Sequence, residues 1–346
     1  MEDIKFRSAW LSITYDCNNR CIWCYSNSSS NETRKNTMSK EMLNSSRKLL
    51  KDLGIEKITL IGGEPTMYKG IEEIVATSKE MGFNVGMVSN GRKFSSKKFT
   101  KKIKESSLDR LTISIEGSNR EMHDKITQVP GSFEQSIRGI DNCHELGIPI
   151  ATESTVSYIN QEDLPSLVRF LKSKSIGMAS FNVCGPCLTK EHNFTVQPKD
   201  ASDLLAKIYK TSKEVGLKIT IVTPQPLCNF DQELIEDILK NKAMNTRCYS
   251  FYGRGFVVDF NGDILPCVHY SGFPFFNIKR NGDYISKDEF LEEFFSEGKT
   301  ADKFRKKLWN YPSTKCVKDQ DYGTKCLGGC PLFWFKFDPE EQIKGK

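Results

Sequence analysis

The chain has 346 residues, enough for roughly two domains and a sizeable hydrophobic core. Hydrophobic residues make up 38% and charged residues 27%, with 24 Gly and 13 Pro, so the composition excludes a disordered, low-complexity or fibrous chain. The net charge of +6 comes from 50 basic and 44 acidic residues that are spread along the chain, apart from short basic runs such as 97–104. This excess is too small to indicate nucleic-acid binding by itself.

The first ten residues carry four charges and no apolar core, so they do not form a secretory signal. No apolar run approaches the length of a membrane span. We therefore expect a cytoplasmic protein without a nucleic-acid or membrane partner. Disulfides are rare in the cytoplasm, so the 12 Cys residues are expected to bind metal or to perform redox chemistry. With only 4 His, a thiol-rich site favours zinc or iron–sulfur clusters.

Short apolar runs alternate with longer amphipathic segments from residue 8 to about 222. Such alternation is typical of strand–helix units around a parallel sheet. Strands are expected at 10–15, 57–61, 84–88, 110–115, 149–156 and 178–183. Helices are expected at about 39–53, 71–81, 95–105, 133–146, 164–173 and 199–215. Six units fall short of the eight in a closed barrel, so the sequence predicts an α/β fold with a partial (β/α)6 TIM-like barrel.

The alternation stops around residues 224–230, and the chain then becomes rich in Cys, Gly and aromatic residues. A hairpin-like stretch at 255–268 contains Asn261-Gly262, a dipeptide that favours tight turns. We therefore expect a barrel domain at 1–225 and a small Cys-rich C-terminal domain at 226–346.

Three Cys residues follow the first expected strand, Cys17, Cys21 and Cys24, in C-x3-C-x2-C spacing. They lie at the carboxyl end of that strand, where barrels of this kind place their active sites. Three thiolates from one loop suit one face of a [4Fe-4S] cube and leave one iron to bind a small molecule. The alternative is a structural zinc site, which normally has a fourth ligand close by, and no further Cys occurs before Cys143.

This loop, with Trp23 before its last Cys, resembles the signature of the radical S-adenosylmethionine (SAM) enzymes. In that family, the amino and carboxylate groups of SAM chelate the free iron of the cluster. The reduced cluster cleaves SAM to methionine and a 5′-deoxyadenosyl radical, which abstracts a substrate hydrogen. The resemblance therefore implies a [4Fe-4S] cluster, SAM as cofactor and an external electron donor of the flavodoxin or ferredoxin type.

The end of the second strand carries a further match to the family. Gly62-Gly63-Glu64 follows this strand directly. Glycine lets a backbone approach a ligand closely, and a carboxylate can pair with an ammonium group. By resemblance, Glu64 and the backbone of Gly62 and Gly63 hold the methionyl amine of SAM.

Strands three and four end in polar residues, Asn90, Ser114 and Glu116. Polar tips on apolar strands at one face of a barrel indicate ligand contacts, and the family uses such tips for the ribose and carboxylate of SAM. Thr127 stands where the family pattern has Arg. The carboxylate contact is therefore open, with Arg138 as the candidate substitute.

Five Cys residues lie in the C-terminal region: Cys248, Cys267, Cys316, Cys326 and Cys330. The spacings Gly262-x4-Cys267 and Cys326-x3-Cys330-Pro331 resemble parts of the SPASM and twitch extensions, which hold auxiliary iron–sulfur clusters in a large branch of the family. The full SPASM pattern has more thiols, so the resemblance implies one auxiliary cluster. Cys248 and Cys267 are the favoured ligands, with two of the other three, and a structural zinc site is the alternative.

Cys184, Cys187 and Cys228 are candidate catalytic residues. Cys184-Gly-Pro-Cys187 follows the sixth strand, and its spacing suits a redox pair or a metal chelate, or else a turn with two incidental thiols. Cys228 is a candidate ligand of the auxiliary site or a hydrogen-atom donor to a substrate radical. Cys143, inside an amphipathic helix, is expected in the core.

The leading hypothesis for function is a peptide maturase, because the SPASM or twitch extension most often accompanies modification of ribosomally made peptides. The modifications are thioether or carbon–carbon crosslinks, or epimerisation. About ten residues precede the first strand, so we expect no fused leader-peptide domain, and a separate leader-binding protein or the open groove would recognise the peptide. One alternative is oxidation or rearrangement of a small molecule such as a sugar or a tetrapyrrole. Another is a non-catalytic zinc-binding protein.

Overall fold

A computed structural model of the chain describes residues 6, 8–26, 32–188, 193–248, 253–308, 326 and 328–343. The chain divides into two compact units. Unit 1 comprises Met1–Ser114, Ile126–Ile150 and Tyr249–Lys306, and unit 2 comprises Ile115–Lys125, Ala151–Cys248 and Lys307–Lys346. Each unit therefore combines segments from both sides of the expected boundary at residue 225, and the two sequence domains stay a prediction.

The strands of unit 1 lie in the order β10-β9-β8-β1-β2-β3-β4. Their bounds are β1 Ser8–Thr14, β2 Lys57–Gly62, β3 Asn84–Ser89, β4 Arg110–Ser114, β8 Gly255–Val258, β9 Asp263–Leu265 and β10 Phe276–Asn277. β1 pairs in parallel with β2 on one side and with β8 on the other, so that Ala9 lies opposite both Ile58 and Phe256. β8 and β9 form an antiparallel hairpin, as the Asn261-Gly262 dipeptide predicts. The small strands β11 (Lys279–Arg280) and β12 (Asp283–Tyr284) pair separately.

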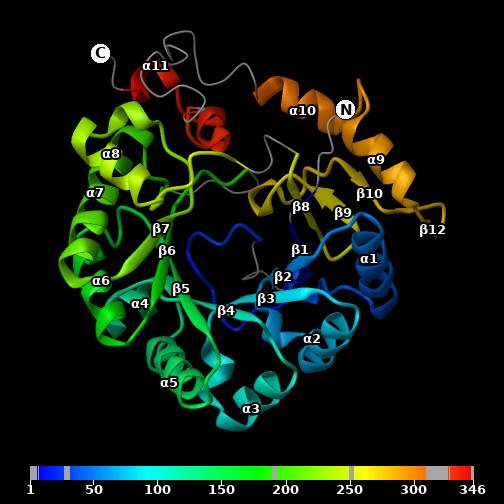
Figure 1. Ribbon diagram of the computed structural model, residues 1–346, viewed down its shortest axis with the longest axis horizontal. Helices are drawn as coiled ribbons and strands as arrows, with labels where there is room; N and C mark the ends of the chain where they lie inside the picture. Colours follow the sequence, from blue (N-terminus) through cyan, green and yellow to red (C-terminus); the bar gives the residue numbers. More distant parts are fainter. Residues whose placement is uncertain are drawn as a thin grey trace. The chain divides into compact units, whose positions relative to one another are not determined.

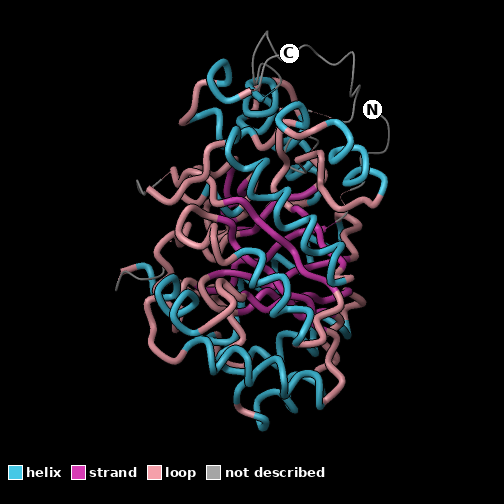
Figure 2. Tube along the Cα trace, turned by 90° about the vertical axis from the view of Figure 1, so that its left-hand side faces the viewer, coloured by secondary structure: helices cyan, strands magenta, loops and turns pink. Residues whose placement is uncertain are grey.

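The helices of unit 1 follow the strands in alternation and lie along one face of β1–β4 (Figures 1 and 2). Their bounds are α1 Lys40–Asp52, α2 Ile71–Glu80, α3 Lys97–Glu105, α5 Ser132–Glu145 and α9 Lys287–Phe295, while α4 Arg120–Thr127 and α10 Thr300–Leu308 run from one unit into the other. Ser39 begins α1, because its side chain accepts a hydrogen bond from the backbone amide of Met42 at 3.1 Å. α9 has a full capping box between Ser286 and Glu289.

An aromatic cluster attaches α9 to the sheet. The Phe6 ring lies 5.2 Å from that of Phe256 on β8 and 5.3 Å from that of Phe294 on α9, and Phe256 lies 5.0 Å from Phe290. Phe290 and Phe294 are at most 1% exposed. Edge-to-face pairs of this kind add to the apolar burial of each ring. They therefore hold β8 and α9 together next to β1.

Unit 2 has a parallel sheet of the strands β5 (Ile150–Val156), β6 (Met178–Val183) and β7 (Lys218–Ile221). The helices α6 (Leu164–Ser173), α7 (Pro198–Val215) and α8 (Gln232–Lys240) flank it (Figure 1). The C-terminal segment adds the short helices η7 (Pro331–Phe335) and α11 (Pro339–Gln342). In the described part of the chain, no helix is both long and apolar enough to cross a membrane.

The six strands and six helices expected from the alternation are confirmed, each end within two residues of its expected position. β7 was not expected, because its four residues are too few to show a periodic pattern. The pairing of β8 with β1 was not expected either, because nothing local in a sequence specifies a partner strand so far along the chain.

The end of β2 makes a very close approach to the loop that follows β1. The Gly62 backbone has a φ of +147°, and an added Cβ there would lie 2.0 Å from the carbonyl oxygen of Thr14. A Cβ on Gly63 would lie 2.5 Å from the Tyr15 carbonyl oxygen and 2.6 Å from that of Asp16. Both contacts are with backbone, which has little freedom to move, so these positions require glycine.

We expect Gly63→Ala to lower the free energy of unfolding by about 2–3 kcal/mol, because the added methyl group forces the two backbone segments apart. Gly177→Ala is the matched control, since a Cβ at Gly177 meets nothing within 4 Å. Thermal unfolding followed by circular dichroism measures both variants. Equal melting temperatures for the two variants would contradict the requirement for glycine at residue 63.

Candidate functional site

Cys17, Cys21 and Cys24 lie together on the loop after β1 in unit 1, and all three are half-buried. The Asn19 amide donates a hydrogen bond to the Cys17 sulfur at 3.3 Å. The Cys24 sulfur lies 3.2 Å from the Ser26 hydroxyl oxygen. Polar hydrogen donated to sulfur stabilises the thiolate, the form that binds metal. Three such thiols on one loop fit the donor set of an iron–sulfur cluster.

Backbone contacts hold this Cys loop on the segment 126–127. The Arg20 amide donates to the Thr127 carbonyl at 2.9 Å, and the Ile22 amide donates to the Ile126 carbonyl at 3.1 Å. The Thr127 hydroxyl lies 2.6 Å from that of Ser132. Thr127, where the family pattern has Arg, therefore has a backbone role in positioning the loop.

Asn90 and Arg92, at the end of β3, contact the Cys loop from its other side. The Asn90 side-chain amide donates to the side-chain oxygen of Asn18 at 2.6 Å. The Arg92 guanidinium donates to the Asn18 carbonyl oxygen and, at 3.0 Å, to the side-chain oxygen of Asn19. Sequence reasoning found Asn90 and missed Arg92, although Arg92 follows the polar strand end directly. Arg138, the candidate from the sequence, lies on the exposed face of α5.

Glu64 is 1% exposed and joins the ends of β2 and β3. Its carboxylate accepts hydrogen bonds from the Thr66 amide (3.1 Å), the Thr66 hydroxyl (2.7 Å), the Ser89 hydroxyl (2.8 Å) and the Asn90 amide (2.7 Å). Burial raises the pKa of Glu64, and these four donors oppose the rise. Ser114, another expected cofactor residue of unit 1, ends β4 and is half-buried. The Gly63 amide donates its hydrogen bond to the Thr14 carbonyl, so this N–H group is not directed at a ligand.

Tyr15, just before the Cys loop, is tied to the β8–β9 hairpin. Its hydroxyl donates to the Asp259 carboxylate at 2.7 Å and lies 2.9 Å from the Ser271 hydroxyl. Burial raises the pKa of both Tyr15 and Asp259. Farther along the loop, the Tyr25 hydroxyl donates to the Gly62 carbonyl at 3.2 Å. No local sequence signal predicts the Tyr15–Asp259 pair, because the two residues are 244 positions apart.

Glu116 belongs to unit 2 and is 7% exposed. Its carboxylate accepts from the Thr155 amide at 2.8 Å, and its own amide donates to Nδ1 of the buried His123 at 3.1 Å. Burial raises the pKa of Glu116 from its usual 4.5 to about 8, the Thr155 amide hydrogen bond opposes the rise, and the charge of Glu153 adds to it to a smaller extent. Near neutral pH the carboxyl group is therefore mostly protonated.

Cys184 and Cys187 lie beyond β6 in unit 2. Cys184 is buried, its amide donates to the Val156 carbonyl at 2.9 Å, and burial together with the Glu116 charge raises the pKa of its thiol to about 12. Cys187 is half-buried. Residues 184–187 contain no turn or bend, so this tetrapeptide is not the turn that was one reading of its sequence.

The remaining Cys residues are divided between the units. Cys248, Cys326 and Cys330 belong to unit 2, as does Cys228 on the short helix η4 (Leu227–Asn229). Cys267 belongs to unit 1, and Cys316 lies outside the described residues. Cys143 is fully buried, as expected. Across the described ranges, no three His, Cys, Asp and Glu side chains have the geometry of a site for one metal ion.

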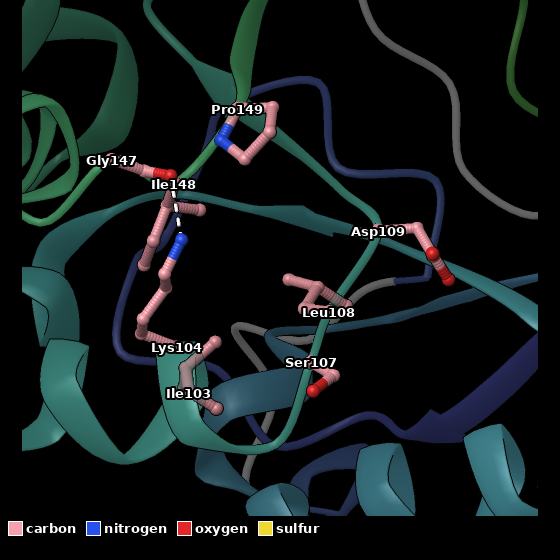
Figure 3. A pocket seen from close by; sticks show the side chains of 8 residues that line it. All are labelled: Ile103, Lys104, Ser107, Leu108, Asp109, Gly147, Ile148 and Pro149. Carbon is pink, nitrogen blue, oxygen red and sulfur yellow. Dashed lines mark hydrogen bonds between the residues drawn. The ribbon is translucent and has the colours of Figure 1, made fainter.

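A cavity of about 380 Å³ lies in unit 1 at the amino ends of the strands (Figure 3). Its lining includes Asp109, just before β4, and Pro149, just before β5. The Lys104 ammonium reaches across it to donate to the Gly147 carbonyl at 2.8 Å (Figure 3). None of the expected site residues lines this cavity.

Glu116→Gln should change how stability depends on pH. Because the folded pKa of about 8 lies above the usual 4.5, ionisation of Glu116 destabilises the folded wild type progressively as pH rises between these values. Gln cannot ionise and still accepts from Thr155. The melting temperature of the variant relative to wild type should therefore rise between pH 5 and 8.5, by an amount equivalent to about 2–4 kcal/mol. Differential scanning fluorimetry measures this change.

The exposed Glu162 supplies the control for this measurement, since Glu162→Gln removes one carboxylate from the surface of the same unit. Its melting temperature relative to wild type should stay nearly constant with pH. If Glu116→Gln shows the same flat dependence, the assignment of a raised pKa to Glu116 is wrong.

Residues 11–171 match the family model of the Radical SAM superfamily. The Fe-coproporphyrin III synthase of Methanosarcina barkeri is 27% identical over 226 residues, which cover 63% of this chain and 55% of that protein. The chain thus spans about half the length of this curated relative.

Two solved structures share the fold. Native anSMEcpe with bound AdoMet superposes with a TM-score of 0.72 at 20% identity, covering 94% of this chain and 89% of that one. Streptococcus suis SuiB bound to its precursor peptide SuiA superposes with a TM-score of 0.70 at 17% identity, covering 98% and 75%. The expected α/β fold of the partial-barrel type is thereby confirmed, with a Cys-rich C-terminal region. The superfamily whose model residues 11–171 match implies a [4Fe-4S] cluster and SAM as cofactors.

Proposed function

We propose that this protein is a radical SAM enzyme that modifies a ribosomally made peptide. The observation that carries the proposal is the Cys loop, three thiols in C-x3-C-x2-C spacing on a backbone held by hydrogen bonds at both sides. The peptide as substrate draws support from the fold shared with SuiB, which was solved with its precursor peptide. The proposal includes an external flavodoxin- or ferredoxin-type electron donor and a separate leader-binding protein.

The residues of unit 1 have distinct tasks in this proposal. Cys17, Cys21 and Cys24 hold the cluster, and Glu64 and Ser114 contact SAM. When bound, the cluster supplies the electron that cleaves SAM to methionine and a 5′-deoxyadenosyl radical. Asn90 and Arg92 fix the Cys loop through Asn18 and Asn19, so that the three thiols keep their spacing. The protein thus positions the reacting groups, while the cofactors supply the difficult step.

A small-molecule reaction is the second candidate function. The 27% identity to Fe-coproporphyrin III synthase over 226 residues favours a tetrapyrrole among small molecules. Anaerobic reconstitution with SAM and dithionite, followed by mass spectrometry, separates the two. Peptides encoded by neighbouring genes form one substrate set. Iron tetrapyrroles that are precursors of iron coproporphyrin III, the product for which that relative is named, form the other. A mass change in a peptide alone supports the peptide proposal, and a mass change in a tetrapyrrole alone overturns it.

Replacing Cys17, Cys21 and Cys24 together by Ala should abolish formation of 5′-deoxyadenosine from SAM under dithionite, because no thiolate remains to hold the cluster. Cys143→Ala is the control, since Cys143 is a fully buried thiol on α5, outside the C-x3-C-x2-C loop in sequence, and the variant should keep the wild-type product. Liquid chromatography quantifies 5′-deoxyadenosine. An unchanged yield from the triple variant would refute the proposed role of the loop.

A further inference from the structure

Three loops of unit 2 that are far apart in sequence pack against one another, and each carries a half-buried thiol. They are residues 184–188 after β6, residues 223–229 after β7, and residues 328–333 in the C-terminal segment. Their thiols are Cys187, Cys228 and Cys330. In the sequence these residues belong to separate motifs, and nothing local relates the three loops.

Glycine contacts fix the C-terminal loop on the other two. Gly329 has a φ of +83°, and an added Cβ there would lie 2.8 Å from Cδ of Pro226. The Cys330 amide donates to the Pro224 carbonyl at 2.9 Å. On the other side, a Cβ on Gly185 would lie 3.1 Å from Cδ2 of Leu332. The backbone positions of all three loops are therefore set by close packing.

Additional bonds keep the C-terminal segment in place. The Trp334 indole donates to the Gly328 carbonyl at 3.0 Å. Asn229, next to Cys228, donates to the Gln342 carbonyl at 3.0 Å and to the Pro198 carbonyl at 3.1 Å. Figure 1 shows this segment beside α7 and α8. The three thiol-bearing loops are therefore held together by hydrogen bonds and close packing and are not independent surface loops.

We infer that Cys187, Cys228 and Cys330 are ligands of one iron–sulfur centre in unit 2. This inference deepens the proposed function, since it assigns ligands to an auxiliary cluster. It differs from the sequence expectation, which placed Cys187 and Cys228 outside the favoured set.

A cluster suits these thiols better than a single ion. Each iron of a cluster takes its own thiolate, so the sulfur atoms need not converge on one point. The donor set consists of thiols alone, which favours iron–sulfur or zinc over other metals. Cys184 makes a contrast within the same tetrapeptide, because it is only 5% exposed, whereas Cys187 is half-buried.

The test uses full-length protein carrying Cys17→Ala, Cys21→Ala and Cys24→Ala, so that iron in the product reports only other sites. After anaerobic reconstitution, this background should retain about four iron atoms per chain if the centre is a cube. Adding Cys187→Ser or Cys228→Ser should lower iron and sulfide at least about twofold, whereas Cys184→Ser should leave both unchanged. Zinc is measured in the same samples.

Alkylation of the wild-type holoprotein is a second measurement that does not depend on how the variants fold. Tryptic peptides 175–190, 219–240 and 326–336 carry Cys187, Cys228 and Cys330. The first also contains Cys184 and the last also contains Cys326, so tandem mass spectrometry assigns each alkylated residue. The three thiols should resist iodoacetamide while iron is bound and react after its removal. The inference is overturned if the background holds no iron, if zinc replaces it, if Cys184→Ser has the same effect, or if Cys187 or Cys228 reacts at full iron occupancy. None of these readouts involves SAM cleavage, so a failed cleavage assay leaves them interpretable.

Discussion

The Cys loop depends on the close contact between the ends of β1 and β2. The Gly63 amide donates to the Thr14 carbonyl at 2.6 Å, and the Glu64 amide donates to the Asp16 carbonyl at 2.8 Å. This contact is open only to residues without a side chain, which explains the Gly62-Gly63 pair in physical terms. The loop therefore leaves β1 in a fixed direction. Folding of the chain positions the three thiols. Metal binding therefore does not carry the entropic cost of ordering the loop.

Polar residues at the strand ends form hydrogen bonds with one another and with the Cys loop even without a ligand. Glu64 has four donors within the protein, and Asn90 and Arg92 are both bonded to the Cys loop. Polar residues at a strand end can therefore have two roles: they hold a neighbouring loop in place, and they can bind a ligand. The two tasks are compatible, because a group whose position is fixed by bonds on one side presents its remaining atoms with little loss of freedom.

The sequence predicts local features well and distant pairings poorly. The strand and helix positions follow from periodicity, and the β8–β9 hairpin follows from Asn261-Gly262. The parallel pairing of β8 with β1 and the Tyr15–Asp259 bond could not be predicted, because no residue near either partner specifies the other. Arg92 shows a different limit. Its neighbours at the end of β3 indicated a site, but the family pattern directed attention to Thr127 and Arg138.

The Cys184-Gly-Pro-Cys187 segment shows why spacing alone is ambiguous for thiols. A chelate or a disulfide needs the chain to turn between the two Cys residues, because the sulfur atoms must approach each other. The segment has no turn, but the charge of Cys187 contributes to the raised pKa of the Cys184 thiol, so the two thiols are close enough to interact. Cys184 continues from β6 into a buried position beside Glu116, and Cys187 lies on the loop that Gly185 fixes against Leu332. The path of the backbone determines which residues lie near each thiol. A spacing pattern in the sequence does not contain this information.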